Sequence, residues 1–297
     1  MIKALCVGVV TVDTIALVDK YPASDERVLA ESIIRSVGGP AAVAAVALAR
    51  QGIKSAFAGT IGEDADGDFI LSTLQREGVD TSGITRSSNV TSGSVIVVSK
   101  SEKSRAISTR QPITQSTPSQ TVKTLAKEVE WVHVDHVGIN QLQTLEIARG
   151  KSAKISFDAG YGVKDFDVRK VDLFAPNDRQ MAERHPNLST AQATEADSKT
   201  GSNIVATTMG AKGSVAYSQE SGLVSANAVT GEILSTLGAG DVFHGALLAQ
   251  LILGFDLADA LNRANVVAGL SCRGLDGISK IPTKSELDAY LKELNNG

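Results

Sequence analysis

The chain has 297 residues, of which 42% are hydrophobic, and this suffices for one large α/β domain or two smaller ones that fold without disulfides. Cys6 and Cys272 stand far apart in the sequence without metal-ligand spacing, so they are predicted to be reduced thiols in a cytoplasmic protein. A formal net charge of −4 and an aromatic content of only 4% exclude a nucleic-acid surface, which needs a basic stripe and stacking rings, and favour a small-molecule substrate. No apolar run reaches the length of a membrane helix and no signal peptide is evident, so no membrane partner is predicted.

The amino-terminal third is predicted to mix strands and helices. Residues 4–10 form an apolar run that predicts a buried strand, and residues 15–18 predict a second strand. Residues 27–36 are predicted to form another extended segment. Asp13 is expected between the first two strands, where they leave the core. The further elements predicted here are a helix at 40–51, a strand at 54–60, a helix at 67–77, a strand at 92–99 and a hairpin partner for it at 105–110.

From about residue 120 the pattern alternates as in stacked βαβ units. The predicted elements are a helix at 121–128, strands at 131–137, 154–158, 171–174 and 203–207, and helices at 141–150 and 178–184. This alternation predicts a Rossmann-like α/β fold, with a mostly parallel sheet flanked by helices, that binds ligands at the carboxyl ends of its strands. Segments 14–36 and 91–110 do not fit the alternation and are expected to form a small antiparallel β-lid on a single domain spanning 1–297.

The most informative motif is Gly238-Ala239-Gly240-Asp241, directly before an apolar helix predicted for 242–251. The two glycines allow a tight turn that points backbone N–H groups into one space, and the helix adds the positive end of its dipole there. Asp241 lies at the same helix start, where it is placed to accept the proton of a hydroxyl group. The motif predicts phosphoryl transfer to an alcohol, although these residues alone also fit a glycine-rich loop with an N-cap aspartate.

A second glycine-rich segment, 208–213, follows a predicted strand and contains Thr208, Gly210 and Gly213. It offers flexible backbone N–H groups and Lys212 to a phosphate, or it forms an ordinary hairpin turn. Because no glycine immediately precedes the lysine, it is not a P-loop. Since no G-x-G-x-x-G follows the first strand, an NAD-dependent oxidoreductase is disfavoured as well.

The histidines do not predict a metal site. His133 and His136 flank Asp135 on a predicted strand, whose geometry puts the two rings on opposite faces. A strand-end histidine near the substrate stays an open interpretation. His244, one turn into the motif helix, is predicted to pack behind Asp241 rather than to act as the catalyst.

In this order the motifs resemble the ribokinase (PfkB) family of carbohydrate kinases, over residues 4 to 290. The resemblance rests on Gly8 with Asp13, Gly38-Gly39, the block 58–67, Pro176-Asn177, the segment 208–213, the motif 238–241 and Asn265. The opening segment and the motif helix are most similar to the ketohexokinase and bacterial sulfofructose kinase branches, which phosphorylate ketoses. The resemblance implies a ribokinase-like fold and an enzyme that uses ATP and Mg²⁺ to phosphorylate a primary hydroxyl of a small sugar, a ketose or ribose.

The resemblance also implies roles for individual residues. Asp241 would be the general base, while the N–H groups of Ala239 and Gly240 stabilise the transferring phosphoryl group, with Gly238 shaping the turn. The remaining implied assignments are Asp13, Gly38 and Gly39 at the sugar, and Asn177, Thr208, Gly210, Gly213 and Asn265 at the nucleotide and its metal. Arg27 and Arg110, on the predicted lid, would bind substrate if they face inward, and the substrate would then carry an anionic group.

Four departures from the family pattern limit this transfer of roles, one of which is that Asp158-Ala159-Gly160-Tyr161 lacks the family's usual asparagine and arginine further along. Gln180 stands where many members have a glutamate, and no metal ligand is assigned. Ser235 replaces an aspartate associated with a monovalent-cation site, so K⁺ dependence is doubtful. Val43 replaces a sugar-binding asparagine, which makes the pocket atypical.

Two rival functions stay open on the sequence. One is a nucleoside kinase of the same fold, which the low aromatic content disfavours. The other is a sugar-binding regulator that has lost catalysis, which the intact Gly238-Ala239-Gly240-Asp241 motif disfavours. The alternation in residues 94–98 predicts one apolar lid face, and lid pairing across a twofold axis is expected to give a homodimer.

Overall fold

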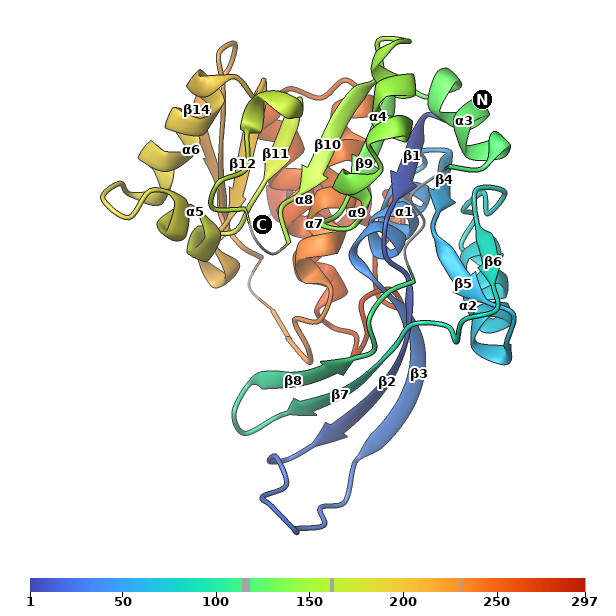
Figure 1. The fold of residues 1–297 in the computed structure, drawn as a ribbon. Helices are drawn as coiled ribbons and strands as arrows, with labels where there is room; N and C mark the ends of the chain where they lie inside the picture. The colour runs from blue at the N-terminus through green and yellow to red at the C-terminus, as the bar shows by residue number, and fades with distance from the viewer. Residues whose placement is uncertain (114–117, 161–162, 230, 297) are drawn as a thin grey trace.

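The computed structural model describes residues 1–113, 118–160, 163–229 and 231–296 (Figure 1). Its centre is an eight-stranded sheet in the order β14-β13-β12-β11-β10-β9-β1-β4. The strands are β1 Ala4–Val7, β4 Ser55–Ala58, β9 Trp131–Val134, β10 Lys154–Asp158, β11 Leu173–Ala175, β12 Ile204–Thr208, β13 Ser214–Ser218 and β14 Gly222–Ala226. The first six of these strands along the chain pair in parallel, and β13 pairs antiparallel with both β12 and β14, so the predicted mostly parallel sheet is confirmed.

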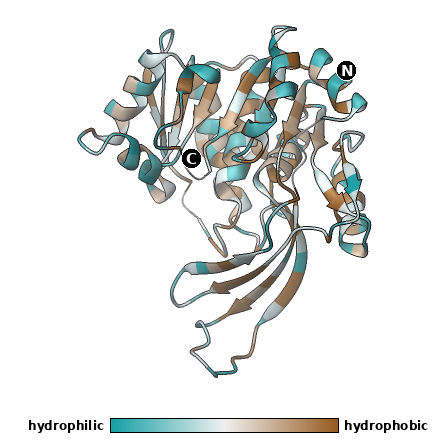
Figure 2. Cartoon of the chain, in the orientation of Figure 1, coloured by the Kyte–Doolittle hydropathy of each residue, from teal (hydrophilic) through white to brown (hydrophobic). Residues whose placement is uncertain are grey.

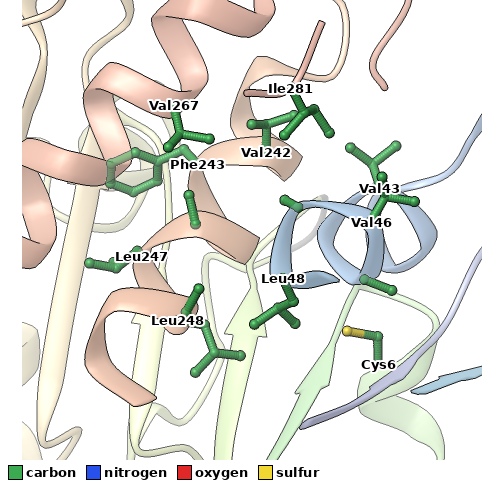
Figure 3. Packing of buried hydrophobic residues seen from close by; sticks show 14 of the residues in the cluster. Cys6, Val43, Val46, Leu48, Val242, Phe243, Leu247, Leu248, Val267 and Ile281 are labelled. Atoms are coloured by element: carbon green, nitrogen blue, oxygen red, sulfur yellow. The ribbon is translucent and has the colours of Figure 1, made fainter. Parts of the chain in front are cut away.

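Helices cover both faces of this sheet (Figure 1). One layer comprises α1 Pro40–Arg50, α7 Ala239–Ile252, α8 Leu257–Ser271 and α9 Lys284–Asn296, and the other α3 Gln120–Glu128, α4 Leu142–Arg149, α5 Asp178–Arg184 and α6 Thr190–Thr200. Strand β1 shows why two cores form, because its side chains alternate: Ala4 and Cys6 join the first cluster, whereas Leu5 and Val7 join the second. Figure 3 shows Cys6 with Val43, Val46 and Leu48 of α1, Val242, Phe243, Leu247 and Leu248 of α7 and Val267 of α8.

Shorter elements complete the domain. They are α2 Ala65–Arg76, the parallel pair β5 Thr60–Gly62 and β6 Thr85–Ser87, and the 3-10 turns Gly138–Asn140, Val168–Lys170 and Gly210–Lys212. In the described part of the chain, none of the helices combines the length and apolar content that crossing a bilayer requires. Both cysteines are buried free thiols.

The predicted lid is a separate four-stranded sheet that projects from the domain (Figure 1). Its order is β3-β2-β7-β8, formed by β3 Ser32–Gly38, β2 Thr11–Val18, β7 Gly93–Ser99 and β8 Ser104–Thr109. The β2–β3 and β7–β8 pairs are antiparallel, whereas β2 and β7 pair in parallel. On its inner face Ile15 and Ile96 pack with Leu275 of the domain, which fixes the lid to the body.

The placement of Asp13 between two strands was wrong, because it lies inside β2. Strand β2 already starts at Thr11, whose register partner is Gly38, and Asp13 pairs with Ser94 of β7. The alternation that starts at Thr11 puts Asp13 on the inner lid face together with Ile15. The chain therefore enters the lid earlier than predicted and carries Asp13 to the mouth of the domain.

Helix α6 and the hairpin β13–β14 were not predicted. The buried positions of α6 are occupied by Ala193, Thr194, Asp197 and Ser198, so no apolar periodicity marks the helix. Its one sequence signal is the capping box of Ser189 and Gln192.

Candidate active site

A cavity of about 580 Å³ lies between the lid and the carboxyl edge of the central sheet. It brings together five of the residues that the sequence assigned to sugar and catalysis: Asp13, Gly38, Gly39, Gly238 and Asp241. These residues come from the lid, the start of α1 and the start of α7, which are far apart in the sequence. Thr11, Ser94, Thr109, Gln111 and His136 add polar groups to the wall. The sequence left open whether a strand-end histidine lies near the substrate, and His136 is such a residue in the cavity wall.

Asp13 is buried in β2 and points into this cavity. The Thr11 hydroxyl donates to Asp13 Oδ1 over 2.7 Å, which fixes the carboxylate. Burial raises the pKa of Asp13, hydrogen bonds from Thr11 and Ser94 partly oppose this, and Asp276 adds to the rise. A Cβ at Gly38 would collide with the Asp13 carboxylate, so this glycine leaves room for it.

Gly39 starts α1 in a conformation that favours glycine. Its φ is 98°, and a Cβ there would lie 2.5 Å from the Val9 carbonyl oxygen. The glycine therefore lets the start of α1 approach the end of β1. Val43, one turn later, lines the cavity with an apolar side chain where the family pattern has an asparagine.

The start of α7 is shaped for an anion. Gly238 precedes the helix in the left-handed region with φ 74°, and a Cβ there would lie 2.7 Å from Gly277 Cα. At Gly240 a Cβ would meet no atom within 4 Å, so the backbone faces open space. No side chain caps this helix, and in the free protein the Ala239 N–H donates to Thr236 O over 3.3 Å. The positive end of the α7 dipole is thus open to a ligand.

Asp241 lies in the first turn of α7 and lines the cavity. Burial, and after it the charge of Asp158, raise the pKa of Asp241 to about 8, although His244 opposes this rise. A carboxylate with a proton affinity near neutrality suits a general base. Position and electrostatics therefore both support the role that the sequence assigned to Asp241.

A second cavity of about 460 Å³ lies on the other side of the α7 start. Six residues that were assigned to the nucleotide or to the phosphoryl group line this second cavity: Thr208, Gly210, Gly213, Asn265, Ala239 and Gly240. Gly238 and Asp241 line the first cavity, whereas Ala239 and Gly240 line the second. The four-residue motif therefore separates the two cavities. An acceptor in the first and a phosphoryl donor in the second would meet at this helix terminus.

The two asparagines assigned to the nucleotide are engaged with the protein. Asn265 donates through Nδ2 to Ala226 O over 2.9 Å and accepts from Ser214 through Oδ1 over 3.1 Å, so it shapes the cavity wall. Asn177 caps α5 in a capping box with Gln180 and is bridged to Thr208, and it does not line either cavity. Gln180, besides capping, donates to the Gly160 carbonyl.

Arg27 and Arg110, which were predicted to bind substrate if they face inward, do not line the first cavity. Arg27 is exposed in the connection between β2 and β3, because β3 starts only at Ser32. Arg110 follows the end of β8, and its guanidinium donates to Thr91 O over 2.9 Å. Among the described residues, neither arginine lines the first cavity.

Arg105 is the lid arginine that the sequence reasoning missed. It lies on β8 and donates to the Thr236 hydroxyl over 2.9 Å, next to the second cavity. The alternation along β8 was the available signal, since it puts Arg105 on the same face as Ile107 and Thr109, which line the first cavity.

Comparisons with known proteins find matches that span nearly the whole chain. A family model described as pfkB family carbohydrate kinase matches residues 1–284. The chain is 25% identical to a ribokinase of Lactococcus lactis, covering 99% of this chain and 98% of the relative, and 26% identical to a ketohexokinase of Mus musculus, covering 93% and 98%. Its fold is similar to that of the Arabidopsis thaliana ribokinase solved with ribose and ATP, with a TM-score of 0.85, 20% identity and coverage of 98% and 99%.

Proposed function

The chain belongs to the pfkB family of carbohydrate kinases and is an ATP-dependent sugar kinase, and on this premise we propose that it phosphorylates a primary hydroxyl of a small neutral sugar, either a ketose or ribose. The observation that carries the proposal is the start of α7, with Asp241 in one cavity and the Ala239–Gly240 backbone in the other. The first cavity would hold the sugar and the second the nucleotide.

In this reaction the sugar hydroxyl loses its proton to Asp241 as its oxygen bonds to the terminal phosphorus of ATP. The bond from that phosphorus to the bridging oxygen breaks, and ADP leaves. Charge on the transferring group is stabilised by the uncapped N–H groups at the start of α7, which are fixed before the reaction begins. Arg105, held at Thr236, adds a positive charge on the nucleotide side.

The charges of the first cavity support a neutral substrate. Among its described lining residues there is no arginine or lysine, whereas Asp13 and Asp241 are both carboxylates. A phosphate or sulfonate on the sugar would lie near these carboxylates without a compensating cation, which is costly at low dielectric. The sugar hydroxyls, by contrast, would donate to Asp13 and accept from Thr11, Ser94 and Thr109.

The same wall argues against a nucleoside. The described part of the cavity lining contains no phenylalanine, tyrosine or tryptophan on which a base could stack. A regulator without catalysis is less consistent with the structure, because a raised pKa at Asp241 and an uncapped helix start serve the reaction rather than sugar binding alone.

The residues present fit a Mg²⁺ ion that is bound mainly through the nucleotide. The described residues contain no cluster of three or more His, Cys, Asp or Glu side chains suited to a metal ion. Mg²⁺ in phosphoryl-transfer sites is commonly held by substrate phosphates and water with few protein ligands, and it would neutralise phosphate charge. The family resemblance implies Asn177 as a protein contact near this ion, but its side chain caps α5 and lines neither cavity, and Gln180 supplies an amide rather than a carboxylate.

Activity with Na⁺ as the only monovalent cation is expected to stay within a few-fold of that with K⁺. Ser235 is buried, and its hydroxyl oxygen accepts the Leu237 N–H over 3.1 Å, so it closes the turn without supplying a carboxylate. Initial rates in matched KCl and NaCl buffers measure this. A large requirement for K⁺ would show that backbone carbonyls alone build a cation site here.

The lid is expected to form a homodimer. Ile33 and Val95 are 67% and 60% exposed, and both lie on the outer lid face, since Thr14 pairs with Val95 and Ala16 with Ile33. Figure 2 shows hydrophobic colour along these strands. An exposed apolar sheet face favours pairing with a second copy.

Sedimentation velocity at micromolar concentration tests this dimer. The wild type is expected to sediment as a dimer and Val95→Asp as a monomer. Leu223→Asp is the matched control, because Leu223 is a similarly exposed strand residue outside the lid. A monomeric wild type with full kinase activity would contradict the prediction.

The substrate class is tested by ADP release from MgATP over a panel of acceptors. Neutral ketoses and ribose should give the highest kcat/KM, and their phosphorylated or sulfonated counterparts should be much poorer acceptors. A preference for an anionic sugar or for a nucleoside would overturn the proposed class. Sugar binding in a thermal-shift assay with no turnover would favour the regulator instead.

A further inference from the structure

A buried ion pair lies directly behind Asp241. Asp158 is the last residue of β10, and His244 lies on α7 one turn after Asp241. Asp158 Oδ2 and His244 Nδ1 are 2.8 Å apart, and the two side chains are only 8% and 7% exposed. The reaction described above uses neither residue, although both adjoin its general base.

The surroundings leave His244 as the cation of this cluster. Burial lowers the pKa of the neighbouring His133 to about 4, so its ring, 6.4 Å from that of His244, is neutral. The other titratable groups that face Asp241 are the carboxylates of Asp158, Asp135 and, across the cavity, Asp13, together with the imidazole of His136 on the same cavity wall. Asp135, at the end of β9, accepts backbone N–H bonds from Val9 and Gly138.

The two carboxylates that face His244 favour its protonated form. Burial lowers the pKa of His244, but Asp158 and then Asp241 raise it by more, so its pKa is raised overall. Burial conversely raises the pKa of Asp158, and the charge and hydrogen bond of His244 overcome this and lower it. One imidazolium therefore serves two carboxylates, one of which is the proposed base.

We propose that Asp158 and His244 act as a positioning pair that orients Asp241 and sets the pH at which it accepts the hydroxyl proton, an inference that rests on the proposed function. The imidazolium stabilises the ionised Asp241 before the reaction. Once Asp241 has taken the proton, its carboxylic acid donates a hydrogen bond to Asp158. The pair thus offers a partner to both protonation states of Asp241.

Substitutions of the two members of the pair are expected to change the pKa of Asp241 in opposite directions. His244→Asn removes the cation, so Asp241 should be harder to ionise. Asp158→Asn removes the carboxylate whose charge and hydrogen bond raise the pKa of Asp241, so Asp241 should be easier to ionise. A merely structural role would lower stability in both variants without moving the titration of Asp241 in opposite directions.

The first readout needs no substrate. Because the pKa of Asp241 is about 8 in the folded protein and about 3.9 in an unfolded chain, the wild type should lose stability relative to Asp241→Asn as pH rises through this window. The difference in Tm should level off above about pH 8. The pH at which this difference in Tm becomes constant should rise in the His244→Asn background and fall in the Asp158→Asn background, each by about one unit or more.

The second readout is the pH profile of kcat/KM with a neutral sugar, in which the acidic limb should move in the same two directions. Asp197→Asn is the matched control, since Asp197 is a buried carboxylate paired with His185 and Arg184 on α5 and α6 and lines neither cavity. Its profile should stay in place.

The outcomes separate the two claims. Opposite shifts in the stability profiles without turnover of any sugar would support the pair and reject the proposed substrate class. The proposed role of the pair would be overturned if both variants turn over sugar and the acidic limbs of their pH profiles stay in place. It would also be overturned if the two limbs move in the same direction. If His244→Asn fails to fold, Asp158→Asn alone must still show the downward shift.

Discussion

Replacing Asp241 by asparagine is expected to lower kcat by roughly 10²–10⁴-fold, the usual contribution of a positioned general base. The amide keeps the shape of the side chain but cannot accept the hydroxyl proton. The KM for ATP should stay nearly unchanged, because the second cavity is lined by the Ala239 and Gly240 backbone rather than by the Asp241 side chain. Steady-state kinetics with each substrate varied in turn measure both effects.

The control for this variant is its stability. Since a partly buried carboxylate with a raised pKa destabilises the folded state at neutral pH, Asp241→Asn should have a Tm equal to or above that of the wild type. A loss of kcat then reports on chemistry rather than on unfolding. A kcat within a few-fold of the wild type would remove Asp241 from the mechanism.

Asp13→Ala is expected to raise the KM for the sugar by about 10²-fold, since it removes a buried carboxylate that accepts hydrogen bonds from the substrate. The KM for ATP should stay close to the wild-type value, because Asp13 lines only the first cavity. Asp13→Asn should lose less, as the amide still accepts one bond and keeps contact with Thr11. Isothermal titration with the sugar checks affinity independently of turnover.

Equal losses of sugar and ATP affinity in Asp13→Ala would contradict this assignment. They would mean that the substitution disturbs the lid as a whole. Thr14→Ala is the matched lid control, because Thr14 is the next residue of β2 and its register partners lie on the outer face.

The parts of the fold and of the site that could be predicted depend on residues that are close together in the sequence. The alternation of strands and helices after residue 120 forces a parallel sheet, and a parallel sheet collects strand ends at one edge. The two cavities lie at this edge. The motif at 238–241 was readable because its glycines and aspartate are adjacent in the sequence and determine one helix start.

The parts that were missed depend on tertiary register. Whether a lid arginine faces the site is decided by strand pairing, which placed Arg105 at Thr236 and left Arg27 and Arg110 away from the cavity. The Asp158–His244 pair joins β10 to α7 across the sheet edge, and no local pattern announces it.

Two departures from the family pattern acquire a structural explanation. Gln180 completes the α5 capping box and donates to Gly160, while the Ser235 hydroxyl closes the turn to Leu237. Both uncharged side chains are thus satisfied by local hydrogen bonds. Their presence is compatible with catalysis by Asp241.

Proton-coupled ³¹P NMR of the product tests the transfer to a primary hydroxyl most directly. A neutral ketose or ribose that turns over with MgATP should yield a phosphomonoester signal split into a triplet by the two protons of the adjacent carbon, and Asp241→Asn should yield none over the same time. A doublet would place the phosphate on a secondary carbon or on the anomeric carbon of ribose, and a singlet would place it on the anomeric carbon of a ketose. Either signal, or undiminished product from Asp241→Asn, would contradict the proposed reaction.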